Sequence, residues 1–158
     1  MENMQQMIKN NDIPNERREV FLSAAISSGI KDEKLRHNFL SYTTVGDRVK
    51  NEAFQLTKMS APTTVDSESL KTWAYDLPRG LSINDYVLLK QSQGEVEVAG
   101  KIKYEAQKSG VLFGRELDLV GGDDLRELYP DKKIGRWVGS TLNRVRAEQY
   151  AGGFKNKS

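Results

Sequence analysis

Cysteine is absent from the 158 residues of this chain, and histidine occurs once, at His37. The lack of cysteine excludes disulfide bonds, thiolate metal sites and a cysteine nucleophile, and it is consistent with a reducing compartment. The HxxxH and HExxH spacings that typically bind zinc are also missing. We therefore expect no catalytic residue, metal site or cofactor, and we predict that the protein is not an enzyme.

Long apolar runs are absent as well. No stretch approaches the roughly 20 apolar residues that a transmembrane helix requires. The opening residues MENMQQMIKNND lack the apolar centre of a signal peptide. Apolar residues make up 37% of the chain and charged residues 29%, which is typical of a folded domain with a core. We expect a chain without a membrane span, located in the cytoplasm or in a particle assembled there.

The charge is unevenly distributed along the chain. The formal net charge is only +2, but residues 129–158 hold seven basic and two acidic side chains. Residues 42–128 lean the other way, with eleven basic and fourteen acidic side chains. The positive charge therefore lies at the C-terminal end, where it is suited to an acidic or phosphate-bearing partner.

The first 44 residues indicate a helical hairpin. Asn15 is a suitable N-cap for a helix over residues 16–29, in which apolar residues recur at helical spacing and Gly29 ends the pattern. Asp32 is placed to cap a second helix over residues 33–42. Two short helices so close together favour an αα-hairpin.

From about residue 45 the pattern changes to short alternating segments, which indicate strands. We expect strands over residues 53–58, 70–76, 85–91, 95–106 and 110–119, joined by polar turns. The core candidates of this sheet are Val87, Leu89, Val96, Val98, Ile102, Tyr104, Val111 and Phe113. Strands without helices between them predict an antiparallel sheet or a small barrel.

Helical patterns return after the glycines at 121 and 122. Asp123 or Asp124 is placed to cap a short helix over residues 123–129, and a last helix is expected within residues 139–153. The predicted fold class is therefore α+β, with an N-terminal helical hairpin, a small antiparallel β-barrel or sheet, and C-terminal helices. The predicted domains are residues 1–44, 45–128 and 129–158.

The basic C-terminal segment is the best candidate for an interaction surface. Its cations alternate with aromatic side chains, and these residue types are enriched at protein interfaces and also bind phosphates and bases. The candidate contact residues are Arg136, Trp137, Arg144, Arg146, Tyr150 and Phe154. We expect deletion of residues 148–158 to leave the fold intact while weakening partner binding.

Residues 48–128 resemble a PilZ domain, the six-stranded β-barrel module that binds cyclic di-GMP in many bacteria. The resemblance depends on a V-x-G-x-V strand, a following G-V-x-F strand and a short helix with spaced leucines. The matching residues are Val98, Gly100, Ile102, Gly110, Val111, Phe113, Leu125 and Leu128.

The ligand motifs of that family, RxxxR and D-x-S-x-x-G, match only in part. Arg48 stands at the first arginine, but Glu52 occupies the place of the second. Asp76 and Gly80 flank a shortened second motif in which proline replaces serine. The residues that the resemblance implies as ligand-binding are Arg48, Asp76, Arg79 and Gly80. Since charge-assisted contacts contribute about 1.5–3 kcal/mol each, we expect binding of cyclic di-GMP to be weak or lost.

Three functions remain open on the sequence. The resemblance implies a regulatory module that contacts proteins or associates with itself. A structural or assembly protein, for instance a phage particle component, fits the same patterns, because short strands and polar loops do not specify a partner. The third is a nucleic-acid-binding accessory protein that uses the basic C-terminus.

Overall fold

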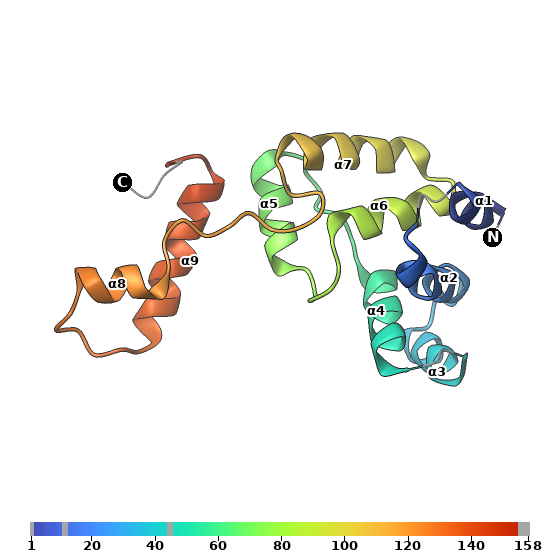
Figure 1. The fold of residues 1–158 in the computed structure, drawn as a ribbon, viewed down its shortest axis with the longest axis horizontal. Helices are drawn as coiled ribbons and strands as arrows, with labels where there is room; N and C mark the ends of the chain where they lie inside the picture. Colours follow the sequence, from blue (N-terminus) through green and yellow to red (C-terminus); the bar gives the residue numbers. More distant parts are fainter. Residues whose placement is uncertain (1, 11–12, 44–45, 155–158) are drawn as a thin grey trace.

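The computed structural model describes residues 2–10, 13–43 and 46–154, and their regular structure is entirely helical. Figure 1 shows α1 to α7 gathered together, with α8 and α9 beside them beyond an extended linker. The helices are α1 (Glu2–Lys9), α2 (Arg18–Ser27), α3 (Glu33–Thr43), α4 (Asp47–Lys58), α5 (Ser67–Asp76), α6 (Ile83–Ser92), α7 (Val96–Lys108), α8 (Gly122–Leu128) and α9 (Arg136–Tyr150), and a 3-10 helix, η1 (Asn15–Arg17), precedes α2.

Side-chain caps begin two of the central helices. At the start of α6, the Asp85 carboxylate accepts a hydrogen bond from the Ser82 backbone N–H at 2.8 Å, and the Ser82 hydroxyl accepts from the Asp85 N–H at 3.4 Å. At the start of α5, Asp66 accepts from the Ser69 N–H at 2.8 Å. Each cap stabilises its helix by about 0.5–2 kcal/mol.

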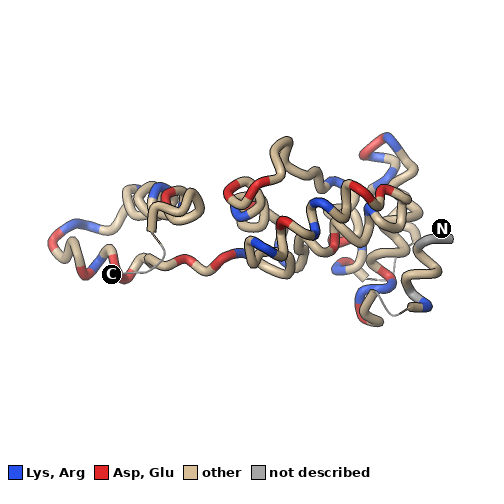
Figure 2. The backbone as a smooth tube through the Cα atoms, turned by 90° about the horizontal axis from the view of Figure 1, so that it is seen from above, with Lys and Arg blue, Asp and Glu red and all other residues tan. Residues whose placement is uncertain are grey.

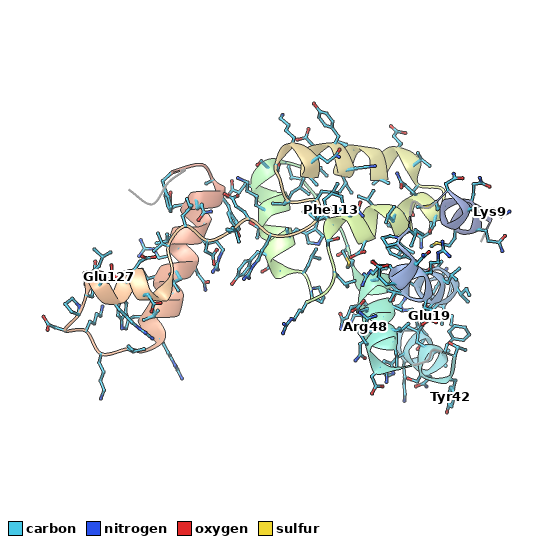
Figure 3. The ribbon with its side chains drawn as sticks, in the orientation of Figure 1. Lys9, Glu19, Tyr42, Arg48, Phe113 and Glu127 are labelled. Atoms are coloured by element: carbon cyan, nitrogen blue, oxygen red, sulfur yellow. The ribbon has the colours of Figure 1, made fainter. Side chains whose placement is uncertain are left out.

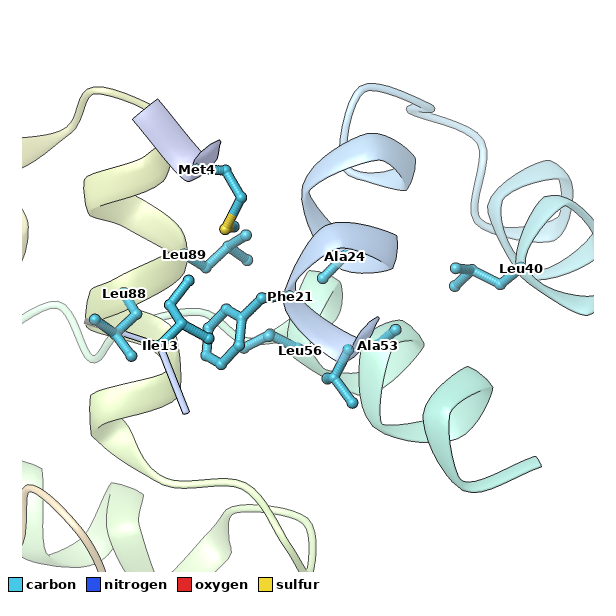
Figure 4. Packing of buried hydrophobic residues seen from close by; sticks show 10 residues of the cluster. Met4, Ile13, Phe21, Ala24, Leu40, Ala53, Leu56, Leu88 and Leu89 are labelled. Atoms are coloured by element: carbon cyan, nitrogen blue, oxygen red, sulfur yellow. The ribbon is translucent and has the colours of Figure 1, made fainter. Parts of the chain in front are cut away.

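The first hydrophobic cluster holds α1, α2, α3, α4 and α6 together. Phe21 of α2 lies near its centre, between Leu56 of α4 and the side chains of α6 (Figure 4). Its buried members are Met4, Ile13, Val20, Phe21, Ala24, Leu40, Ala53, Leu56, Leu88 and Leu89. The cluster joins residues from both sides of position 44, so the N-terminal helices and the segment that follows them share one core.

A second cluster packs α5, α6 and α7 against one another. It contains Ile83 and Val87 of α6, which are fully buried, and Ile102 of α7. The remaining buried members are Leu70, Ala74, Tyr86, Ala99, Ala106, Val111 and Leu112. The two faces of α6 therefore serve two clusters, which explains why seven of its ten residues are buried.

The predicted sheet or barrel is wrong, and with it the α+β fold class. Four of the expected strands are helices, namely α4, α5, α6 and α7, and the fifth, at residues 110–119, runs into the non-helical linker. The described residues contain no strand, so the segment that resembles a PilZ domain does not form the barrel of that family. The helices expected near residues 16–29, 33–42, 123–129 and 139–153 are present as α2, α3, α8 and α9.

The alternating pattern in α7 led to a wrong strand prediction because three of the apolar residues that formed it are exposed. Val96, Val98 and Tyr104 are 61%, 50% and 64% exposed. The buried face is formed by Ala99, Ile102 and Ala106, whose spacings of three and four residues belong to a helix. Among the core candidates, Val87, Leu89, Ile102 and Val111 are buried, whereas Val96, Val98, Tyr104 and Phe113 are not.

The chain after Leu112 is organised differently from the chain before it. We call the described residues up to 112 the body and residues 113–154 the arm. Among the described residues, neither hydrophobic cluster includes one from the arm. The arm consists of the linker at 113–121, the short helix α8 and the longer helix α9, and α9 packs against α8 and against α5 of the body.

Candidate functional site

Arg146 of α9 makes the main ionic contact between α9 and the linker. Its guanidinium donates to both carboxylate oxygens of Asp118, at 2.9 and 3.1 Å. It also lies 3.8 Å from the centre of the Tyr75 ring, on α5. One side chain thus joins α9, the linker and the body, because a planar guanidinium can bind a carboxylate with its edge and an aromatic ring with its face.

We call this contact of α9 with the linker and with α5 the joint. Gln149 contributes to the joint through hydrogen bonds to the linker. It is 3% exposed, its side-chain oxygen accepts from the Leu119 N–H at 3.0 Å, and its nitrogen donates to the Leu117 carbonyl at 2.9 Å and to Glu116 at 3.1 Å. Glu116 in turn pairs with Lys71 of α5 at 2.8 Å. Gln149 therefore holds α9 to the linker, and the Lys71–Glu116 ion pair attaches the linker to the body.

The Arg146–Asp118 contact should make this joint sensitive to acid. The hydrogen bonds from Arg146 hold the pKa of Asp118 below its usual value. A depressed carboxyl pKa gives stability that is present above the unfolded-state value, about 3.9, and is lost as pH falls through the folded-state value. We expect the Tyr75 ring signals in proton NMR to shift below about pH 4. Asp118→Asn should remove most of that shift, and an unchanged titration in this variant would contradict the assignment.

Tyr150 lies in the same joint and is 5% exposed. Burial raises the pKa of its phenol, and its hydroxyl oxygen has no hydrogen-bond partner among the described residues. Tyr150 is therefore a packing residue of the joint, as Arg146 is an ionic one. Since residues 149 and 150 are buried, we expect deletion of 148–158 to remove contacts of α9 with the linker while the two hydrophobic clusters of the body stay intact.

Trp137 and its neighbours form the free end of the arm. The ring packs edge-on against Tyr129 with centroids 5.9 Å apart, and the Lys132 ammonium lies 4.3 Å from the ring centre. The indole N–H donates to the Lys133 carbonyl at 2.8 Å. These contacts fix the turn between α8 and α9 and hold its basic side chains around an aromatic pair.

Arg136 and Arg144 lie on the exposed side of α9. Neither makes an ion pair or a hydrogen bond through its side chain within the part of the chain that the structure describes. Arg144 also borders a groove of about 560 Å³, whose other lining residues include Val145 and Phe154. Of the six predicted contact residues, Arg136, Trp137, Arg144 and Phe154 are therefore placed on the arm's outer surface or groove.

The four residues suggested as ligand-binding do not form one site. Arg79 and Gly80 border a cavity of about 400 Å³ next to the start of α6. Asp76 borders a different cavity, beside Trp73 and Pro62. Arg48 is exposed on α4 and lies 4.0 Å from Glu52. No common binding position connects the four.

Glu52 belongs instead to an ionic cluster that joins three segments. Arg17 of η1 contacts Glu52 of α4, and its second terminal nitrogen lies 3.1 Å from Asp85 of α6. All three side chains are less than a fifth exposed. Gly80 fits against this cluster, because a Cβ there would lie 3.2 Å from Glu52, and its φ of +89° also favours glycine.

The ionic contact between Arg17 and Glu52 was not predicted from the sequence. The fold brings together residues 35 positions apart in the chain, and no local pattern indicates such a contact. Gln149 was missed for a similar reason, since its partners on the linker lie about 30 residues away. Long-range polar contacts of this kind follow from the packing of the helices.

No helix among the described residues is long and apolar enough to cross a membrane. They also contain no group of three or more histidine, cysteine or acidic residues placed to hold a metal ion. His37 lies on α3, where its ring packs edge-on against Phe54 with centroids 5.0 Å apart.

Comparison with protein families, with curated proteins and with solved structures finds no match to this chain.

Proposed function

We propose that this chain is a non-enzymatic assembly module that binds other protein chains through its arm. The observation that carries the proposal is that the arm adds no residue to either hydrophobic cluster, although it bears large apolar side chains. Five of these are markedly exposed, namely Phe113, Leu117, Leu128, Tyr129 and Ile134, at 77%, 81%, 69%, 53% and 64%.

The arm is too small to bury its own apolar surface. On α9, Val138, Leu142 and Val145 share one helix face and are only partly buried. An apolar stripe on a helix is normally buried against another helix or a sheet. The neighbouring α8 has only seven residues and covers little of the stripe on α9. Exposed apolar surface rimmed by charges is typical of a binding surface.

The body provides a rigid support for this arm. Its two clusters are closed by seven helices, and the polar joint holds α9 at the edge of α5. A binding segment held by a folded support loses less conformational entropy on association than a free tail does. We accordingly propose a location in the cytoplasm or in a particle assembled there, for which the absence of cysteine is suitable.

Site-specific photocrosslinking tests whether the arm is the contact surface. A photoreactive amino acid is placed at Leu128 or Ile134 of the full chain, in the cells that naturally contain it. Leu35 and Val96 of the body are matched controls, because they are similar in type and are 60% and 61% exposed. We expect discrete protein adducts from the two arm positions and few from the controls. Equal adduct formation at all four positions would contradict the proposal.

A further inference from the structure

The free end of the arm combines an apolar centre with charges of both signs. We call residues 123–137 the tip. Leu128, Tyr129 and Ile134 are exposed there, and they come from the end of α8 and the turn that follows. Figure 3 places Glu127 at this end of the molecule, on α8, far from the body. The tip is therefore free of the contacts that attach the arm.

The charges of the tip are balanced. Residues 123–137 hold four acidic and four basic side chains. Figure 2 shows both signs at this end of the chain. A nucleic acid requires an excess of cations, because its affinity comes from neutralised phosphates. A neutral surface with both signs instead favours a protein partner of matching pattern.

Several of these charges have no partner within the described part of the chain. Glu127 and Asp131 make no ion pair there, and neither do Lys133 and Arg136. The acidic pair lies toward α8, and the basic pair lies toward α9. Each pair is therefore available to a second molecule.

We propose that the partner of the tip is a second copy of this chain, an inference that rests on the arm's proposed binding role. In a two-fold dimer the same patch meets itself, so the acidic pair of one copy faces the basic pair of the other, twice over. The apolar side chains Leu128, Tyr129 and Ile134 then fill the centre, and the charged residues form the rim. Complementary charge sets the orientation of the two copies.

Charge exchange between two variants tests this arrangement in the full chain. The first variant is Glu127→Lys with Asp131→Lys, and the second is Lys133→Glu with Arg136→Glu. All four positions are exposed, and the changes at 127 and 136 suit the helix dipoles at the end of α8 and the start of α9. Sedimentation equilibrium at low salt measures the mass of each sample.

The wild type should approach twice the chain mass of 17.8 kDa at concentrations of tens of micromolar, while each variant alone remains near 17.8 kDa. Like charges across the interface should weaken each variant dimer by about tenfold or more. An equimolar mixture of the two variants should recover the dimer, because opposite charges face each other again. Leu128→Ser with Ile134→Ser should also be monomeric, with helical circular dichroism unchanged.

The control is Lys101→Glu with Lys108→Glu. It makes the same change of charge as the second variant, but at exposed positions of α7. The dissociation constant of the control dimer should equal that of the wild-type dimer. A monomeric wild type, a mixture that does not associate, or a control that dissociates as much as the second variant would each overturn the second-copy proposal.

The failure of this inference can be distinguished from the failure of the proposed function. If the wild type is monomeric but photocrosslinks from the arm reach another protein, only the second-copy inference fails. If the arm forms no adducts, the proposed function fails. A monomer that binds a labelled single-stranded oligonucleotide through Lys133 and Arg136 would also overturn the proposal, in favour of nucleic acid.

Discussion

Replacement of Arg17 by methionine is expected to lower the free energy of unfolding by about 3–5 kcal/mol. The change keeps an apolar stem of similar length but removes the guanidinium that contacts Glu52 and Asp85. Two carboxylates, each less than a fifth exposed, would then remain without their cation. Urea unfolding followed by circular dichroism measures the loss.

Arg48→Met is the matched control for this prediction. Arg48 lies 4.0 Å from the same Glu52, but its side chain is 70% exposed, so water screens the interaction. Its replacement should change the unfolding free energy by less than about 1 kcal/mol. Adding Glu52→Gln and Asp85→Asn to Arg17→Met should recover part of the loss, because the isolated charges are then removed. Similar losses for Arg17→Met and Arg48→Met would show that the cluster does not hold the three segments together.

Replacement of Gln149 by methionine is expected to release α9 from the linker. Methionine has a similar volume but cannot hydrogen-bond to Leu117, Leu119 and Glu116. Leaving these groups unsatisfied costs about 1–3 kcal/mol. This corresponds to roughly a five- to hundredfold fall in the equilibrium constant for docking of α9 on the linker. The body should keep its stability, because its clusters contain no arm residue.

Native-state hydrogen exchange measures this release directly. Amides of α9 should exchange faster in Gln149→Met, while those of α6 should be unchanged. Arg144→Met is the control, since Arg144 lies on the same helix and is exposed without a polar partner in the described part of the chain. Faster exchange throughout the body would show that the arm and the body unfold as one unit.

The sequence carried clear signals for some of the helices. Asp32 was a sound indication of the start of α3, because its carboxylate accepts a hydrogen bond from the Leu35 N–H at 2.8 Å. Asn15 does not cap α2, since it begins η1 and the N-cap of α2 is Arg17. The N-cap of α8 is Gly121 rather than an aspartate, although the Asp124 carboxylate accepts from the Gly121 N–H at 2.7 Å. The capping box of Ser82 and Asp85 was also legible in the chain, and it argues for a helix over residues 83–92. The strand prediction for residues 85–91 did not take this capping box into account, and the alternating Val96 and Val98 that favoured the next strand are exposed on α7.

The proposed interaction surface was only partly predictable. Trp137 and Arg136 could be recognised by composition, because aromatic and basic residues were concentrated there. Arg146 and Tyr150 carried the same signal but belong to the joint, where Arg146 binds Asp118 and lies over the Tyr75 ring, and Tyr150 is buried. Composition does not distinguish a residue that faces a partner from one that faces its own chain, since both environments favour the same side chains.

Hydrogen exchange across association tests the central claim that the arm, rather than the body, is the contact surface. Exchange would be recorded for the full chain in dilute solution and in its associated state, either with a second copy or with a protein identified by photocrosslinking. The account predicts slower exchange confined to residues 117–138, with α1 to α7 unchanged. Slower exchange in α1 to α7, with the arm unaffected, would contradict it.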